Sequence, residues 1–182
     1  MENLTDNFLM LKVKSGEVEK LGLLYERYKK RLFGFFFQMN QNAELSEDLV
    51  QNVFVRVLKY KHSYVDESQF ITWLFRIARN VNYDHFRKSP KLQQVELSKA
   101  EQVKLDSGSI EDTITTVEYN DLLKKAMAQL SFEQREVLVL SKYKELKYKE
   151  IGEVMNCSEV AARTKAHRAL TALRTIFLEM DK

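Results

Sequence analysis

The sequence has few of the residues that interrupt regular structure or cross-link a chain. Its 182 residues include one proline, five glycines and one cysteine. So few turn-forming residues argue against a β-rich fold with many tight turns. Since 45% of the residues are hydrophobic, they favour long amphipathic helices instead. The single Cys157 excludes an intramolecular disulfide bond.

Several functional classes lack their sequence signals. No apolar run approaches the roughly 18 residues of a membrane span, and the N-terminus MENLTDNFLMLKVKSG lacks the features of a secretory signal. The three histidines and one cysteine show no zinc-ligand spacing. There is no glycine-rich phosphate loop, no HExxH motif and no convincing carboxylate pair. We therefore expect a cytoplasmic chain without membrane insertion that is not an enzyme and has no cofactor, metal or small-molecule substrate.

The charge is modest in total but unevenly distributed. The formal net charge is +3. Residues 1–88 carry 14 Lys or Arg and 11 Asp or Glu, residues 89–118 carry 3 and 6, and residues 119–182 carry 12 and 9. Two weakly basic blocks thus flank an acidic connector. Residues 163–174 hold four cations and no acid, and such a cluster indicates nucleic-acid binding better than the total charge does.

Apolar periodicity predicts an all-α fold of two small helical domains joined by a flexible linker. The first domain spans 1–90, with helices near 6–13, 17–39, 46–60 and 70–88, and Ser46 is the expected N-cap of the third. Ser89-Pro90 ends it. Residues 91–118 show no sustained period and form the acidic linker, which is either helical in places or disordered until bound. The second domain spans 119–182, with helices from about 119, over 132–143, over 148–155 and over 158–179.

The segment 70–88, FITWLFRIARNVNYDHFRK, has two distinct helical faces. One face is apolar and includes Trp73, Ile77 and Val81. The other carries Arg76, Asn80, Tyr83 and Arg87 at spacings of four, three and four. Cations, an amide and a phenol on one face can neutralise phosphates, hydrogen-bond bases and stack on them. A solvated basic surface is the alternative interpretation.

Residues 148–177 have the form of a helix-turn-helix. Asn156 stands at the turn, where a left-handed residue is needed, and Ser158 is a good N-cap for the second helix. Gly152 allows the close approach of that helix. We expect inward-facing side chains at Val160, Ala161, Leu170, Leu173 and Phe177, and outward-facing ones at Glu159, Arg163, Thr164, Lys165, His167 and Arg168. A helical hairpin with a basic face is the alternative.

Four segments taken in order carry a family resemblance. They are LYERYKKRLFGF at 24–35, SEDLVQNVFVRVLK at 46–59, the segment at 70–88, and LSFEQREVLVLSKYKELKYKEIGEVMNCSEVAARTKAHRAL at 130–170. Together they resemble the extracytoplasmic-function (ECF) sigma factors of bacterial RNA polymerase over nearly the whole chain. The resemblance implies a non-catalytic subunit that binds core polymerase, directs it to promoter DNA and helps to open the duplex. It also implies contacts with the beta-prime clamp and the beta flap, and an anti-sigma partner.

The resemblance assigns residues to three surfaces. Asp48 and Gln51 fall in the segment that docks on the beta-prime clamp, where we expect Asp48 to pair with a cation. The resemblance implies that the minus-ten element and its non-template strand are bound by Tyr64, Phe70, Trp73, Arg76, Arg79, Asn80, Tyr83 and Arg87. Trp73 also suits the core. The resemblance likewise implies that the minus-thirty-five duplex is bound by Ser158, Glu159, Arg163, Thr164, Lys165, His167 and Arg168. The acidic linker resembles the segment that threads the RNA-exit path, where its charge would mimic RNA.

Two other classes explain less of the sequence. An ordinary helix-turn-helix regulator with a helical dimerisation or sensor domain accounts for residues 119–182. It gives no reason for the aromatic and basic helix at 70–88. An enzyme lacks any recognisable catalytic motif.

Overall fold

The computed structural model describes residues 4–65, 67, 69–88, 113–143 and 146–180, and over these ranges every regular element is helical. This confirms the predicted all-α class. Four helices make the N-terminal unit: α1 (Asp6–Ser15), α2 (Leu21–Asn40), α3 (Ala43–Lys59) and α4 (Phe70–Lys88). Short 3-10 turns at Val18–Lys20 and Lys61–Ser63 precede α2 and follow α3.

Local signals explain where these helices begin and end. The Thr5 hydroxyl caps α1 by accepting from the Phe8 amide. Gly16 ends α1 at φ 118°, in the left-handed region that favours glycine. The Asn42 side chain caps α3 by accepting from the Leu45 amide at 2.9 Å. The predicted Ser46 cap is therefore wrong: Ser46 is buried inside α3, and its hydroxyl donates to the Asn42 carbonyl.

The C-terminal unit contains α6 (Thr113–Gln129), α7 (Phe132–Leu138), α8 (Tyr148–Met155) and α9 (Glu159–Met180). The chain continues from α7 into a π-helical turn, η3 (Val139–Tyr143). Ser131 and Gln134 form a reciprocal capping box at the start of α7. The predicted helix over 132–143 is thus present, with its last turn widened. Helix α6 begins inside the segment predicted as linker, and the rest of that segment lies outside the described residues.

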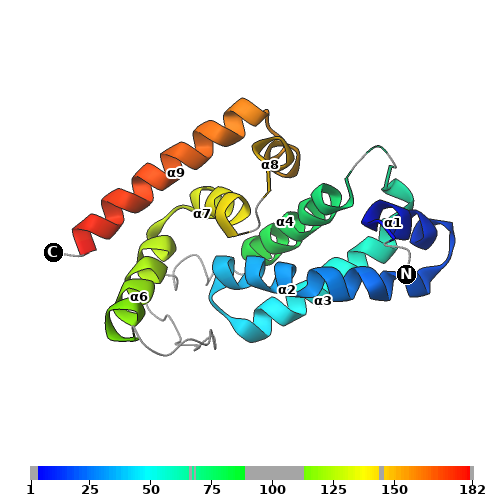
Figure 1. The fold of residues 1–182 in the computed structure, drawn as a ribbon, viewed down its shortest axis with the longest axis horizontal. Helices are drawn as coiled ribbons and strands as arrows, with labels where there is room; N and C mark the ends of the chain where they lie inside the picture. The colour runs from blue at the N-terminus through cyan, green and yellow to red at the C-terminus, as the bar shows by residue number, and fades with distance from the viewer. Residues whose placement is uncertain (1–3, 66, 68, 89–112, 144–145, 181–182) are drawn as a thin grey trace.

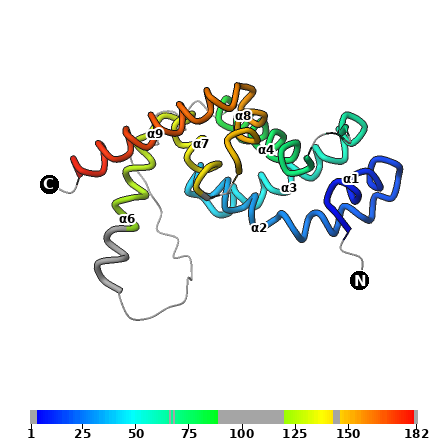
Figure 2. Tube along the Cα trace, turned by 45° about the horizontal axis from the view of Figure 1, so that its top comes forward, coloured from blue at the N-terminus to red at the C-terminus, as the bar shows by residue number. Residues whose placement is uncertain are grey.

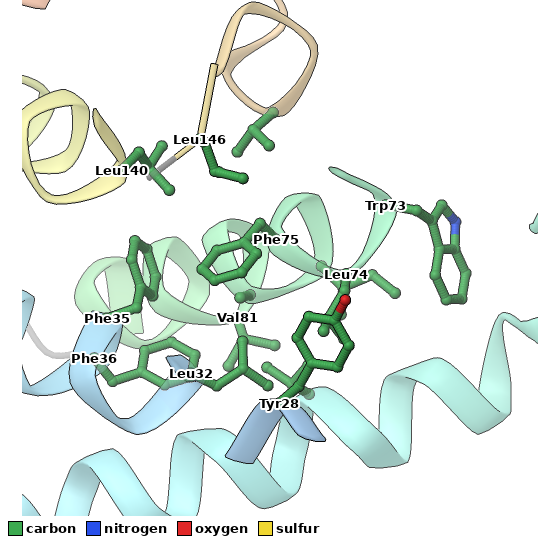
Figure 3. Close-up of a cluster of buried hydrophobic side chains, with 14 of the residues drawn as sticks. Tyr28, Leu32, Phe35, Phe36, Trp73, Leu74, Phe75, Val81, Leu140 and Leu146 are labelled. Carbon is green, nitrogen blue, oxygen red and sulfur yellow. The ribbon is translucent and has the colours of Figure 1, made fainter. Parts of the chain in front are cut away.

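The two units pack against each other (Figure 1). Helix α4 lies with α2 and α3 on one side and with α8 on the other, and the tube view agrees (Figure 2). Phe75 of α4 is completely buried, as are Phe35 of α2 and Leu140 of η3. Figure 3 shows Phe75 between the α2 side chains and the pair Leu140 and Leu146. One continuous apolar core therefore crosses from the N-terminal to the C-terminal unit.

A buried guanidinium adds polar contacts to this junction. Arg135 of α7 is 4% exposed and donates to the Met39 carbonyl of α2 at 2.9 Å. It also donates to the Met127 carbonyl at 3.0 Å and the Ala128 carbonyl at 2.7 Å, both in α6. Carbonyls near the ends of two helices thereby gain a donor that the helices themselves do not supply.

The turn between α8 and α9 depends on Gly152. A Cβ added there would lie 2.7 Å from the Cys157 carbonyl oxygen and 3.2 Å from the Glu159 nitrogen. Both atoms belong to the backbone, so no side-chain rotation can relieve the contact. We expect Gly152→Ala to destabilise the C-terminal unit by about 1–3 kcal/mol, the usual cost of overpacking. Thermal unfolding followed by far-UV circular dichroism measures this loss.

Gly22 supplies the matched control. It lies in α2, and an added Cβ would meet nothing within 4 Å. Gly22→Ala should therefore leave stability unchanged or raise it by about 0.5 kcal/mol, because alanine restricts the unfolded chain. Equal effects at the two glycines would contradict the proposed close approach at Gly152.

Candidate nucleic-acid and protein interfaces

The predicted polar face of α4 is present, and part of it contacts the C-terminal unit. Arg76, Asn80, Tyr83 and Arg87 are exposed, and Arg79 is half-buried. The Arg76 guanidinium donates to the Glu153 carbonyl of α8 through Nε at 3.3 Å and Nη2 at 3.0 Å. The Tyr83 ring meets Phe132 of α7 edge-on, with ring centroids 6.2 Å apart. Phe86 lies 5.1 Å from the same ring.

Arg79 forms an ion pair with a fully buried acid. Its Nε lies 3.0 Å from Oε2 of Glu136, whose side chain has no solvent exposure. Burial raises the pKa of Glu136 above its ordinary value, and the nearby Arg79 charge opposes that rise. The other carboxylate oxygen, Oε1, accepts no hydrogen bond from the described residues. The acid is thus enclosed, and one of its two oxygens is left without a hydrogen bond within the described ranges.

The predicted base-binding aromatics lie in the core. Tyr64 and Phe70 are completely buried, and Trp73 is 8% exposed. Their rings contact one another, with Tyr64 and Trp73 centroids 5.3 Å apart and Phe70 and Trp73 centroids 6.3 Å apart. Hydrogen bonds from α1 fix the backbone of this aromatic cluster. Lys14 donates to the Tyr64 carbonyl, and the Asn7 side chain accepts from the Phe70 amide. Base binding by these three rings stays a prediction, and in this conformation they are packing residues.

The outer face of α3 is available to a partner. Asp48, Gln51 and Asn52 are exposed, together with Val55, which is 64% exposed. A pocket opens between α2 and α3 beside Gln51, and its lining includes Tyr25, Phe33, Val50, Lys29 and Lys30. The face thus combines an acid, amides, an accessible apolar side chain and a cationic border.

Val55 and the α2 side of this pocket were missed by sequence reasoning. Val55 follows Asp48 and Gln51 at helical spacings of seven and four, off the apolar stripe of α3. An apolar residue on the polar side of an amphipathic helix is the signal that could have identified it. The α2 residues gave no such signal, because the pocket depends on how two helices pack.

The helix-turn-helix geometry is as predicted at its turn. Asn156 adopts φ 55° and ψ 48°, the left-handed conformation that the turn requires. The Ser158 hydroxyl accepts from the Ala161 amide at 3.1 Å and caps α9, as expected. Of the residues predicted to face outward, Glu159, Arg163, Thr164, His167 and Arg168 are exposed and Lys165 is only partly exposed; the N-cap Ser158 is exposed as well.

Ion pairs modify this α9 face. Arg163 lies 3.0 Å from Glu159 and over the Tyr148 ring at 5.5 Å. Lys165 is only partly exposed and pairs with Glu133 of α7. Both pairs are at the surface and therefore weak, so the cations can exchange to phosphates at little cost.

The prediction that Val160 and Leu170 face inward is wrong. Val160 is 74% exposed and Leu170 is 47% exposed. The buried positions of α9 are Ala162, Ala166 and Ala169. Small side chains let α9 approach its neighbours closely, so the stripe of alanines faces the core in place of the larger residues.

Two searches of the described residues bear on other site types. They contain no group of three His, Cys, Asp or Glu side chains able to hold a metal ion. Across the same ranges, no helix has the length and apolar character needed to cross a membrane.

Known proteins are similar to this chain in both sequence and fold. Residues 24–91 match sigma-70 region 2, and residues 120–173 match sigma-70 region 4. The ECF RNA polymerase sigma factor SigM of Bacillus subtilis is 33% identical over 85% of this chain and 93% of its own. The RNA polymerase sigma factor CarQ of Myxococcus xanthus is 30% identical over 94% and 97%.

Solved structures give the same fold. CnrH, determined with the cytosolic domain of CnrY, superposes with a TM-score of 0.73 at 21% identity, over 97% of this chain and 99% of that one. RpoE from Bartonella quintana, determined with the anti-sigma factor NepR, gives 0.67 at 23% identity, over 90% and 99%. The two matched regions and the full-length relatives agree with the helix-turn-helix and the basic α4. The chain therefore belongs to the ECF sigma factors, the non-catalytic subunits that direct bacterial RNA polymerase to promoters.

Proposed function

We propose that the outer face of α3 is the surface that docks on the beta-prime clamp of core polymerase. Asp48 and Gln51 are its central residues, and exposed Val55 adds an apolar contact. Interface cores combine apolar anchors with a few directed polar groups, which is the composition of this face. Asp48 would pair with a cation on the clamp and set the register of docking.

Charge reversal at Asp48 tests this surface. Asp48→Arg should weaken the binding of core polymerase about tenfold or more, because a buried attraction becomes a repulsion. Fluorescence anisotropy of the labelled full chain, titrated with core enzyme, measures the change. Asp48→Asn should give a smaller loss.

Glu179→Gln is the matched control for Asp48→Asn. It removes the same charge from an exposed position at the end of α9. If both neutral variants bind core equally well and Asp48→Arg binds like the wild type, α3 is not the docking surface.

We further propose that α4 contacts the melted minus-ten region. Asn80 and Tyr83 would contact bases, and Arg76, Arg79 and Arg87 would hold phosphates of the non-template strand. The exposure of Arg76, Asn80, Tyr83 and Arg87 along one helix face supports this assignment. Tyr64, Phe70 and Trp73 remain predicted base contacts, and a base would reach them only after their present packing loosens. Opening would be driven by tighter binding to the single strand than to the duplex.

Substitutions on α4 separate strand opening from docking. Asn80→Ala and Arg76→Ala should each reduce open complexes about tenfold, since each removes a proposed contact with the single strand. Permanganate footprinting of promoter thymines measures opening, and anisotropy measures the binding of core.

Both α4 variants should bind core as the wild type does. Lys125→Ala is the charge control, because Lys125 is an exposed cation of α6 outside the three proposed surfaces. Loss of core binding in the α4 variants would mean that α4 is a docking or folding surface.

The remaining assignments concern duplex DNA and protein partners. The minus-thirty-five duplex would be read in the major groove by Ser158 and by the α9 residues Glu159, Arg163, Thr164, Lys165, His167 and Arg168, with Arg163 suited to guanine edges. The C-terminal unit would contact the beta flap. CnrH was determined with the cytosolic domain of CnrY, and RpoE was determined with the anti-sigma factor NepR. These complexes support an anti-sigma partner for this chain. A subunit that binds RNA polymerase would be located in the cytoplasm.

A further inference from the structure

The first turn of α9 presents a large apolar side chain to solvent. Val160 is 74% exposed, more than any other large apolar side chain in the described part of the chain. It lies at the start of the second helix of the helix-turn-helix, the part that contacts base edges in such units. Isolated apolar residues are common on protein surfaces, so the surroundings of Val160 decide what it does.

The neighbours of Val160 on this face are proposed duplex-reading residues. Thr164 and His167 follow it by four and seven residues and are exposed as well. These spacings place the three side chains on one stripe of the helix, opposite its buried alanines. Arg163 and Arg168 are exposed on the two sides of that stripe. A duplex held by the two arginines would therefore meet the stripe with its base edges.

Thr164 adds to the apolar character of the stripe. Its Oγ1 donates to the Val160 carbonyl at 2.9 Å, a bond that helical threonines commonly make to their own helix. The hydroxyl hydrogen is thus used within α9, and Thr164 keeps a methyl group and an acceptor oxygen to offer a base. The stripe therefore begins with methyl groups in place of hydrogen-bond donors.

The major groove contains one apolar group that suits this stripe. An A·T pair exposes the C5-methyl group of thymine there, and a G·C pair has no methyl group at that place. Apolar side chains read thymine by contact with its methyl group, whereas arginine reads guanine by paired hydrogen bonds. The exposed methyl groups of Val160 thus fit a base edge better than they fit a phosphate.

We propose that Val160 is a specificity-determining residue that reads the 5-methyl group of a thymine in the minus-thirty-five element. This inference rests on the proposed role of α9 in duplex binding. Contact would remove the methyl groups of valine and of thymine from water together. It would therefore favour an A·T pair at one position of the element, without any hydrogen bond from residue 160 to the base.

Removal of single methyl groups from the DNA tests this contact. Holoenzyme made from the full chain and core polymerase first selects its minus-thirty-five element from duplexes randomised over that region. Each thymine of the selected element, on either strand, is then replaced by deoxyuridine, which lacks only the 5-methyl group. Competition between the thymine and deoxyuridine fragments for limiting holoenzyme measures the ratio of their affinities. The scan is repeated with holoenzyme that carries Val160→Ala.

At one thymine, deoxyuridine should weaken the binding of wild-type holoenzyme about threefold, the effect expected from one buried methyl group. The same change should alter the binding of Val160→Ala by less than about 1.5-fold, because the contact is already lost. Equal losses by the two proteins at every thymine would overturn the proposal, since the methyl group would then be read by other residues or by none. A selected element without any A·T pair would overturn it as well.

Further variants separate this contact from folding and from the proposed role of α9. Because Val160 is so exposed, Val160→Ala should unfold thermally as the wild type does. Leu178→Ala removes another exposed apolar side chain of α9, and its deoxyuridine scan should match that of the wild type.

Arg163→Ala and Arg168→Ala test duplex binding itself, and each should weaken binding of the selected duplex about fivefold or more. If both bind it as the wild type does, α9 does not contact the duplex, and the role of Val160 fails with it. If both weaken binding while no thymine depends on residue 160, the role of Val160 alone is wrong.

Discussion

The packing of α4 on two sides is the constraint on which the rest of the structure depends. Phe75 is buried between α2 and the η3–α8 segment, while Trp73, Ile77 and Val81 face the N-terminal core. A helix buried over so much of its circumference has only narrow polar edges. Arg76 and Arg79 lie on those edges, so their positions are set by the same packing that joins the two units. The core and the proposed DNA contacts are therefore coupled through one helix.

Local chemistry accounts for the parts that sequence reasoning predicted well. The bounds of α4 agree with the expected 70–88, because an apolar period is followed by a proline that ends it. Asn156 and Ser158 were identified because a left-handed turn and an N-cap each need particular residue types. The same reasoning wrongly predicted Ser46 as the N-cap of α3. Asn42 offered an equally good cap one turn earlier, and α3 begins there.

Tertiary packing accounts for the failures. Val160 and Leu170 are larger and more apolar than the alanines of α9, so a prediction from hydrophobicity alone placed them inward. Close helix approach selects by size instead, and Ala162 and Ala166 occupy the buried side. The pairing of Arg79 with Glu136 links residues 57 positions apart. No local period carries that information, and the placement of the two units was accordingly beyond prediction.

Glu136 is the part of this interface that opposes the packing of the two units. A buried ion pair stabilises a fold only when every polar atom around it is satisfied. Glu136 Oε1 accepts no hydrogen bond among the described residues, and burial raises the pKa of this carboxyl despite Arg79. Separation of the units would return both charges to water and recover part of the desolvation cost. The apolar patch at Phe75 favours the packed arrangement of the units, and the incompletely satisfied pair opposes it.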